Sequence, residues 1–171
     1  MKRTFDIAGG VVGLVLASPF LALIALLIKV TSRGPMLFRQ ERIGLGGNTF
    51  TILKFRTMRW DPDAPFVRCA DVRDFRVTPI GRILRCSKLD ELPQFFNILE
   101  GTMSIFGPRP LATEHDWHFA TSVFGYIGRY RVRPGIWSWS KFFTRGNITR
   151  EIHLDARRYG AYLLATTPTA A

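Results

Sequence analysis

The chain has 171 residues, which suits one domain with a single sizeable core. Its formal net charge is +11, from 24 Lys and Arg against 13 Asp and Glu, so we expect anionic partners: nucleic acid, anionic lipid or phosphorylated substrates. The two cysteines, Cys69 and Cys86, form no CxxC pair, which argues against a disulfide framework and a zinc site and fits a reducing compartment.

The N-terminal part of the chain carries an apolar run without charge over residues 7–28. About 22 helical residues extend roughly 33 Å, enough to cross a hydrocarbon core. Ser18 and Pro19 fall at its middle, where the proline ring disrupts the hydrogen-bond ladder. Basic residues flank both ends, and if positive flanks stay cytoplasmic the segment is a re-entrant hairpin. A kinked helix that crosses the membrane is the alternative.

A β-hairpin is predicted next. Residues 36–40 and 49–55 have the composition of two short strands, and the glycine-rich stretch 44–48 supplies the turn. The glycines match neither the GxGxxG pattern nor a P-loop, so they predict no nucleotide site of those types. Lys54 and Arg56 end the second strand, where they are candidates for binding a substrate anion.

A loop and a helix follow the hairpin. Residues 57–75 mix charges, prolines and small residues without periodicity, which predicts a loop. Thr78 and Pro79 supply a cap and a first-turn proline for a helix that continues through Leu84 and carries Arg85.

Asp90 and Glu91 are adjacent acids in an otherwise basic chain, and we interpret them as the reactive centre. Apolar residues recur after them at helical spacing, at Leu92, Phe95, Phe96 and Leu99. Pro93 is tolerated only in a first turn, so the helix is expected to begin near Asp90 and to stop at Gly101. A helix N-terminus favours both an ionised acid and a phosphate. A capping aspartate beside a solvated glutamate is the structural alternative.

A stiff turn and a further helix come after the acids. Residues 107–110, Gly-Pro-Arg-Pro, suit neither a helix nor a central strand, and they present Arg109 in a fixed turn. Residues 113–124 are expected to form a capped helix with His115 and His118 one turn apart. Because no third ligand is nearby, we expect these histidines to lie on the surface rather than to bind metal.

The most mixed stretch of cations and aromatics is 129–139, which includes Arg133. It fits a phosphate site with a stacking platform, and it equally fits an interfacial belt of Trp, Tyr and Arg. Thr149 is expected to cap a last helix. Its apolar stripe consists of Ile152, Ala156, Tyr159 and Leu163.

Taken in order, several blocks of the sequence resemble one family, the bacterial sugar transferases, also called monotopic phosphoglycosyl transferases or polyprenyl-phosphate hexose-1-phosphate transferases. The resemblance extends from Lys2 to about Leu164. The blocks are Lys2, Arg3 and Asp6; Gly34 and Pro35 with QERIG at 40–44; KFRTM at 54–58; LDELPQ at 89–94 with Asn97; and MSIFGPRP at 103–110.

The resemblance implies an enzyme that moves a hexose 1-phosphate from a UDP-sugar to polyprenyl (undecaprenyl) phosphate and releases UMP, in polysaccharide or glycoconjugate assembly. Asp90 matches the family's nucleophile, which forms an aspartyl-phosphosugar, and Glu91 matches its partner. Mg²⁺ would be held by Asp90 and Glu91, and Ser18-Pro19 matches the break in a re-entrant helix. The expected location is the cytoplasmic face of the bacterial inner membrane.

The expected fold class is α+β and mainly helical, with a re-entrant helix-break-helix, a small β-hairpin and amphipathic interfacial helices. Residues 1–30 are expected to form the membrane segment, 31–165 the cytosolic catalytic portion of the same domain, and 166–171 a disordered tail. The candidate residues for substrate phosphates, nucleotide or sugar are Arg85, Arg109, Lys54, Arg56, Arg42 and Arg133.

Two departures from the family pattern support a rival interpretation. Thr102 stands where the family usually has Asp, and residues 137–141 replace a Thr-Gly-Trp-Ala-Gln-like stretch. A membrane-tethered, catalytically degenerate protein that binds sugar nucleotide or lipid phosphate is therefore the alternative. The charge also fits a nucleic-acid binder, but the apolar segment argues against nucleic acid as a partner. The sequence leaves open whether the protein is a homodimer.

Overall fold

The computed structural model describes residues 1–60, 74–144 and 147–166. It is mostly helical, with two small sheets and one long apolar N-terminal helix; η denotes a 3-10 helix. The elements are α1 (Lys2–Thr31), β1 (Leu37–Ile43), η1 (Leu45–Gly47), β2 (Thr49–Phe55), α2 (Pro79–Ser87), η2 (Leu89–Glu91), α3 (Gln94–Glu100), β3 (Ser104–Phe106), α4 (Thr113–Ser122), η3 (Tyr126–Arg131), β4 (Gly135–Trp137), α5 (Trp139–Thr144) and α6 (Ile148–Thr166).

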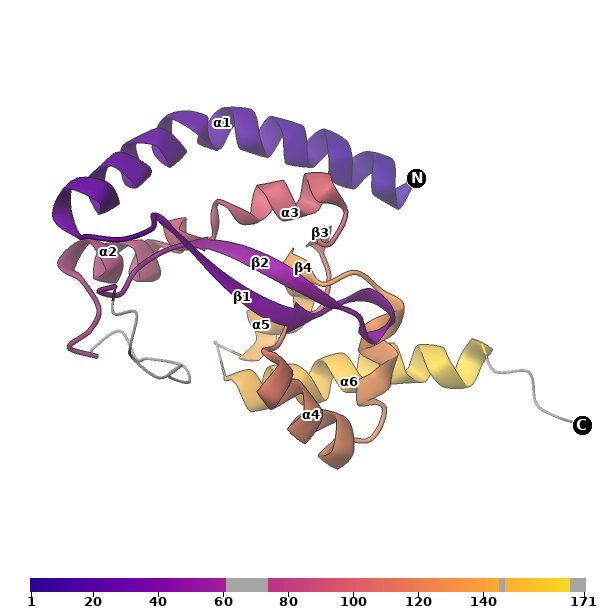
Figure 1. The fold of residues 1–171 in the computed structure, drawn as a ribbon. Coiled ribbons are helices and arrows are strands. Elements are labelled where there is room, and N and C mark those ends of the chain that lie inside the picture. The colour runs from indigo at the N-terminus through magenta and orange to yellow at the C-terminus, as the bar shows by residue number, and fades with distance from the viewer. Residues whose placement is uncertain (61–73, 145–146, 167–171) are drawn as a thin grey trace, which may run out of the picture.

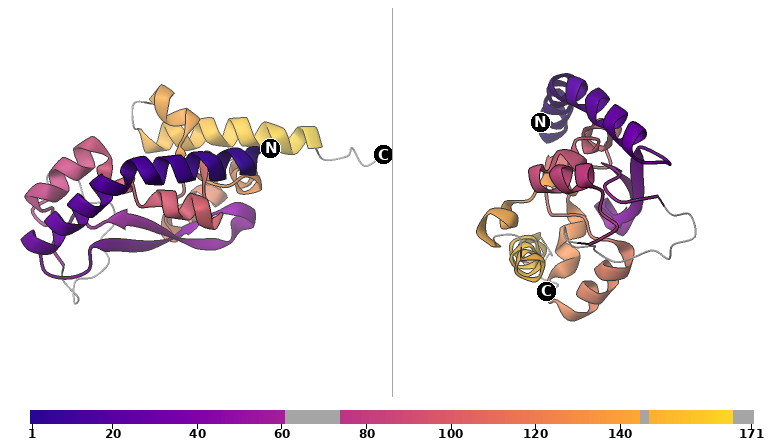
Figure 2. Two further views of the ribbon diagram at one scale, coloured as in Figure 1. Left: turned by 90° about the horizontal axis from the view of Figure 1, so that it is seen from above. Right: turned by 90° about the vertical axis from the view of Figure 1, so that its left-hand side faces the viewer.

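The elements stack in layers below α1. Figure 1 shows α1 arching over α3 and the β1–β2 hairpin, with α4 and α6 on the side away from α1. The same order is visible from the end in Figure 2, where α6 is seen almost along its axis. Most of the loop expected at 57–75, and the tail beyond residue 166, lie outside the described residues.

Helix α1 is continuous through Pro19, and it is bent rather than interrupted (Figure 1). The helix-break-helix expected here is therefore wrong in form, because one helix runs unbroken from Lys2 to Thr31. Near the bend, the Ser18 hydroxyl donates to the carbonyl of Val15 at 2.8 Å. Among the described residues this is the one helix long and apolar enough to cross a membrane, and only 17% of its most apolar window is buried. Such exposed apolar surface is compatible with association with a membrane.

The first turns of α1 are bonded to the elements below it. Arg3 donates to two carbonyl oxygens of the last turn of α3, at 2.6 and 2.9 Å. Asp6, which is 2% exposed, accepts the Ser104 hydroxyl at 2.9 Å and the Ile105 N–H at 3.0 Å. Asp6 therefore carries out a buried anchoring role, since burial of a carboxylate requires such partners.

Glycines let α1 approach α3 closely. A Cβ on Gly13 would lie 2.4 Å from the Phe95 ring, and one on Gly10 would lie 2.9 Å from Leu99. Both distances are too short for a methyl group, so these positions need a residue without a side chain. The first half of α1 is thereby packed against α3, the helix that follows the two acids.

The hairpin prediction is confirmed. Strands β1 and β2 pair antiparallel, with Phe38 opposite Lys54. Asn97 on α3, which is fully buried, joins β2 to α3: its Oδ1 accepts the Leu53 N–H at 3.0 Å and its Nδ2 donates to the Thr51 carbonyl at 2.8 Å.

The helix predicted to begin near Asp90 begins later, at Gln94. The acids lie in η2, where Leu92 N–H bonds to the Leu89 carbonyl at 3.3 Å in an i to i−3 pattern. Pro93 explains the delay, because it has no N–H with which to start an α-helical ladder here. Gly101 ends α3 in the left-handed region at φ 97°, as expected.

Other predicted elements agree in kind and differ at their ends. Thr78 caps α2, since its hydroxyl accepts the Gly81 N–H at 2.9 Å. The cap of α6 is Asn147 rather than Thr149, because Asn147 Oδ1 accepts the Arg150 N–H at 3.0 Å. The parallel pair β3–β4 was not predicted, since strands of three residues are too short to show a period of two.

Candidate active site

The two acids occupy the η2 turn between α2 and α3. Lys88 precedes them in the left-handed region, at φ 63°, and so turns the chain between the helices. Asp90 is only 9% exposed, and among the described residues its buried Oδ1 has no hydrogen-bond partner. A buried carboxylate oxygen without a partner is costly, which marks it as a candidate for binding a ligand.

Glu91 is paired with Lys54. The Lys54 Nζ lies 2.9 Å from Glu91 Oε1, and both side chains are largely buried, with 19% and 16% of their surface exposed. Lys54 belongs to β2, and the hydrogen bonds of Asn97 fix β2 against α3. The pair therefore depends on contacts between residues more than 40 positions apart in the chain.

The environments of the acids shift their pKa values in opposite directions. Burial raises the pKa of Asp90; the positive charge of Lys54 reduces this shift, and the negative charge of Glu91 increases it. Burial also acts to raise the pKa of Glu91, but the ion pair with Lys54, helped by Arg109 and Lys141, holds it below its usual value. Neighbouring carboxylates with divergent pKa values are typical of reactive sites.

A pocket opens beside Glu91 and carries several cations. Its lining residues are Arg42, Ile52, Lys54, Glu91, Gln94, Arg109, Pro110, Gly135 and Ile136. Arg42 is oriented by hydrogen bonds to the Pro110 carbonyl, at 3.3 Å, and to the side-chain oxygen of Gln40. Three cationic side chains around one carboxylate form a place suited to a phosphate or diphosphate.

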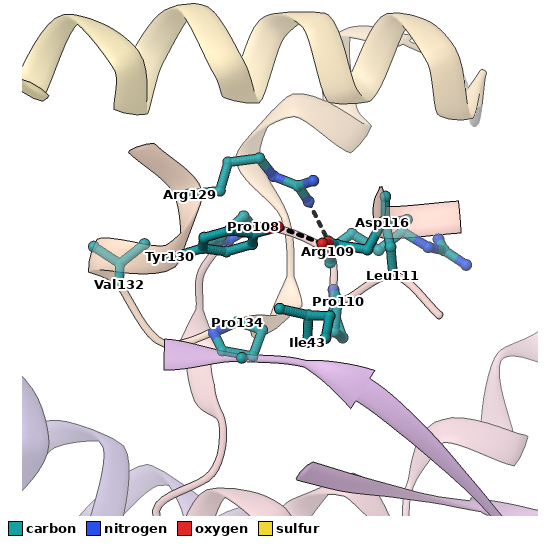
Figure 3. Close-up of a pocket in the computed structure, with 11 residues that line it drawn as sticks. Ile43, Pro108, Arg109, Pro110, Leu111, Asp116, Arg129, Tyr130, Val132 and Pro134 are labelled. Atoms are coloured by element: carbon teal, nitrogen blue, oxygen red, sulfur yellow. Dashed lines mark hydrogen bonds between the residues drawn. The ribbon is translucent and has the colours of Figure 1, made fainter. Parts of the chain in front are cut away.

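A second pocket is lined by the turn that carries Arg109 (Figure 3). There Arg129 donates to the backbone carbonyl of Arg109 at 2.6 Å, and its guanidinium lies 3.6 Å from Asp155 Oδ2. The hydroxyls of Tyr126 and Tyr130 both donate to Asp116. The turn is thus held through the backbone of Arg109. These contacts do not fix its guanidinium, and Arg109 also lines the pocket beside Glu91.

The structure separates the predicted phosphate ligands into two groups. Lys54, Arg42 and Arg109 lie together beside Glu91. Arg85 is close enough to lower the pKa of Asp90, and its Nε donates to the Thr57 hydroxyl at 2.8 Å.

Arg56 and Arg133 are placed differently, because their guanidinium groups bind helix ends. Arg56 donates to the carbonyls of Arg33, at 2.5 Å, and Ser32, at 3.0 Å, just after α1. Arg133 Nε donates to the Gly101 carbonyl, at 2.8 Å, at the end of α3. These contacts of Arg56 and Arg133 are structural, and the contact of either residue with substrate stays a prediction.

The sequence interpretation missed Lys141 as a site residue. Lys141 lies on α5, contributes to the low pKa of Glu91, and has its own pKa lowered chiefly by burial. The available signal was the departure at residues 137–141, which places a lysine where the family pattern has a glutamine-like residue. Gln94, which is buried and lines the pocket, was recognised only as part of the LDELPQ block.

The oxygen ligands that the two acids offer fit one kind of magnesium site. Mg²⁺ is commonly held by one or two carboxylates together with waters and substrate phosphates, and Asp90 offers a buried oxygen without a partner. Across the described part of the chain no group of three or more His, Cys, Asp or Glu side chains could hold a metal, His115 and His118 included. A site completed by the substrate is thus the arrangement that these residues fit.

Comparison with known proteins identifies the family. The family model described as bacterial sugar transferase matches residues 1–163. The chain is 50% identical over 135 residues to a UDP-glucose:undecaprenyl-phosphate glucose-1-phosphate transferase of Caulobacter vibrioides, covering 79% of this chain and 51% of that protein.

Two further relatives carry different names. A UDP-N-acetylgalactosamine-undecaprenyl-phosphate N-acetylgalactosaminephosphotransferase of Aeromonas hydrophila is 41% identical over 82% of this chain and 33% of its own length. An exopolysaccharide production protein PSS of Rhizobium leguminosarum is 46% identical over 80% of this chain and 70% of its own length. The chain spans about half, or less, of the length of the first two relatives. Together with the match over residues 1–163, these similarities show that the chain belongs to the bacterial sugar transferase family.

Proposed function

We propose that this protein moves a hexose 1-phosphate from a UDP-sugar to polyprenyl phosphate, with undecaprenyl phosphate as the expected acceptor, and releases UMP. The observation that carries this proposal is the buried, unbonded Asp90 carboxylate beside the Glu91–Lys54 pair at a cationic pocket. The names of two relatives, which describe undecaprenyl-phosphate sugar transferases, agree with it.

In the proposed reaction Asp90 is the nucleophile. Its carboxylate oxygen attacks the donor phosphorus that carries the hexose, and the bond from that phosphorus to the UMP oxygen breaks, so that UMP leaves with the electron pair. An oxygen of the acceptor phosphate then attacks the same phosphorus and breaks its bond to Asp90, which restores the carboxylate. A covalent intermediate lets a soluble donor and a lipid acceptor use one site in turn.

The surrounding residues supply charge and position. Attack by one anion on another requires neutralisation of the phosphates, which Arg42, Lys54 and Arg109 are placed to provide from the pocket lining. Asp90 and Glu91 would hold Mg²⁺, whose chemistry here is further neutralisation of the diphosphate. In this scheme Glu91 would help to hold the ion, and its cationic neighbours keep its carboxylate ionised.

We further propose that α1 enters and leaves the cytoplasmic leaflet of a bacterial inner membrane from one side. Both of its ends are bonded to the same body: Arg3 and Asp6 attach its start to α3 and β3, and Arg56 binds the carbonyls at its end. A helix with both ends fixed to one body, and with Pro19 inside it, suits a re-entrant segment better than a crossing one. Residues 31–165 would then be the cytosolic part of the same domain, with the amphipathic helix α2 at the interface.

The test is a UMP-release assay on the purified protein with a panel of UDP-sugars, with and without polyprenyl phosphate. We expect UMP release limited to about one equivalent without acceptor, and continuous turnover with acceptor for one UDP-sugar. Continuous UMP release that is no slower without acceptor phosphate than with it would contradict the transfer to polyprenyl phosphate. Tight binding of a UDP-sugar without UMP release in either condition would instead establish the degenerate binding protein, the alternative that Thr102 and residues 137–141 favour.

A further inference from the structure

We propose that Lys54 is a positioning residue that occupies Glu91 until a diphosphate arrives, so that the donor and a divalent cation bind cooperatively. This inference rests on the proposed function, in which a diphosphate donor and a divalent cation share the site. It concerns the order and coupling of their binding, which the family assignment does not specify.

The geometry restricts how Lys54 can move. Its backbone lies in β2, which pairs with β1. Hydrogen bonds of Asn97 Oδ1 and Nδ2 join β2 to α3. Glu91 lies in η2 immediately before α3. Because the backbones on both sides of the ion pair are fixed, separation of the 2.9 Å contact requires rotation of a side chain, that of Lys54 or that of Glu91.

A cation and the Lys54 ammonium compete for one carboxylate. Glu91 Oε1 already accepts the ammonium, in a largely buried setting where like charges repel more strongly than in water. A divalent cation that binds Glu91 therefore has to displace Lys54 from it. Displacement of Lys54 with no new partner would leave a half-buried ammonium unpaired, which opposes cation binding in the absence of donor.

The pocket beside Glu91 supplies the alternative partner. Lys54 lines this pocket together with Arg42 and Arg109, so a phosphate oxygen placed there would lie within reach of the same ammonium. The exchange conserves pairing: Lys54 leaves Glu91 for phosphate, and Glu91 becomes available to the cation. Each ligand thus removes the obstacle to the other, and the coupling between them is necessarily reciprocal.

Binding of Mn²⁺, followed by its electron paramagnetic resonance signal in the detergent-solubilised full chain, tests the inference without turnover. We expect Lys54→Met to bind Mn²⁺ more tightly than the wild type in the absence of nucleotide, by roughly 5- to 150-fold, the usual range of coupling between ligands. The double variant Lys54→Met/Glu91→Gln should lose this gain, since the carboxylate that was released is then absent.

A control separates ion-pair exchange from a general change in charge. Lys88 is exposed, lies two residues from Asp90 and makes no ion pair with Glu91 in the described structure, so Lys88→Met removes the same charge without freeing a carboxylate. Its effect on Mn²⁺ affinity is expected to be much smaller. An equal gain in Lys88→Met, or no gain in Lys54→Met, would overturn the inference. Lys54→Gln, which keeps a hydrogen-bond donor for Glu91, serves if Lys54→Met does not fold.

The second arm measures coupling directly. UDP, which carries the diphosphate but no hexose, is titrated into wild type and Lys54→Met with and without Mg²⁺. A protein-free titration corrects for the UDP–Mg²⁺ complex. Wild type should bind UDP more tightly with Mg²⁺, and this dependence should shrink in Lys54→Met. A dependence of equal size in both proteins contradicts the inference even if wild type releases UMP. Absence of UMP release in wild type contradicts the proposed function whatever the cation results are.

Discussion

The side-chain oxygen of Asn97 accepts a hydrogen bond from the backbone N–H of Leu53 at 3.0 Å. The neighbour of Leu53 is Lys54, whose ammonium reaches Glu91, so this buried contact sets the distance between the strand that supplies the cation and the turn that supplies the acids. An asparagine has an acceptor oxygen and a donor NH₂ group, so it can bond both the N–H of residue 53 and the carbonyl of residue 51.

Asn97→Ala is expected to lower thermal stability and to weaken the site together. It leaves two part-buried backbone groups without their side-chain partner, at a cost of about 1–3 kcal/mol each. For a chain of this length each kcal/mol lowers Tm by roughly 2–4 °C. Thermal unfolding in detergent measures the effect. Asn48→Ala is the matched control, because the Asn48 amide is exposed and bonds only locally, to the Leu45 carbonyl. Equal melting temperatures for wild type and Asn97→Ala would show that the hydrogen bonds of Asn97 do not contribute to thermal stability.

Asp90→Asn is expected to abolish transfer and to leave the fold intact at pH 7. Asparagine keeps the shape and removes a charge that burial disfavours, so the variant should be no less stable than wild type. UMP release and the circular dichroism melting curve, on one preparation, measure the two effects. Full turnover by the folded variant would remove Asp90 from the role of nucleophile.

The raised pKa of Asp90 also predicts how the two proteins differ with pH. In the folded state Asp90 takes up its proton at a higher pH than in the unfolded chain, where the value is near 3.9. Stability from this group therefore rises as pH falls from the raised folded value to about 3.9, and Asp90→Asn lacks this gain. The difference in Tm between wild type and variant should accordingly grow in favour of wild type through that window. Wild-type activity should fall over the same range, because the nucleophile becomes protonated.

Arg109→Lys is expected to reduce catalysis far more than stability. A lysine cannot grip phosphate through two parallel N–H groups, and the loss of one charge-assisted bond costs about 1.5–3 kcal/mol, or roughly 10- to 150-fold in kcat/KM. The turn should stay in place, since Arg129 binds the backbone carbonyl of residue 109 and not its side chain.

Arg129→Met provides the contrast to Arg109→Lys. It breaks a buried pair with Asp155 and frees the carbonyl of residue 109, so we expect a loss of about 3–5 kcal/mol and a lower Tm. Measurement of kcat/KM and Tm on both variants decides between the roles. A depressed Tm with unchanged kcat/KM in Arg109→Lys would exclude Arg109 from substrate binding.

The topology of α1 predicts a labelling pattern. Lys2 and Arg33 are exposed residues just at or beyond the two ends of the helix, and each can be replaced by cysteine in a Cys69→Ser/Cys86→Ser background. In intact bacteria both should resist a membrane-impermeant maleimide, and both should react after permeabilisation. Reaction of one position alone in intact cells would show a helix that crosses the membrane.

Local sequence by itself determined most of the helices and the hairpin, and it singled out the two adjacent acids. The long apolar run, the alternating strands around residues 44–48 and the Thr78-Pro79 start are patterns of short range, so they predicted α1, the hairpin and α2. The acids stood out because adjacent carboxylates are conspicuous in a chain of net charge +11. Boundaries were less exact, as at Pro93, where one missing N–H moved the start of α3.

Only the tertiary structure decided which cations line the pocket beside Glu91. A guanidinium binds a backbone carbonyl at a helix end as readily as a phosphate, so sequence could not distinguish Arg56 and Arg133 from Arg42 and Arg109. Whether a guanidinium binds a carbonyl or a phosphate depends on which of the two lies within its reach. Packing of chain segments that are far apart in sequence determines this. The same is true of Asp6, whose partners Ser104 and Ile105 are nearly 100 residues away, because burial and pairing across such separations leave no local pattern to read.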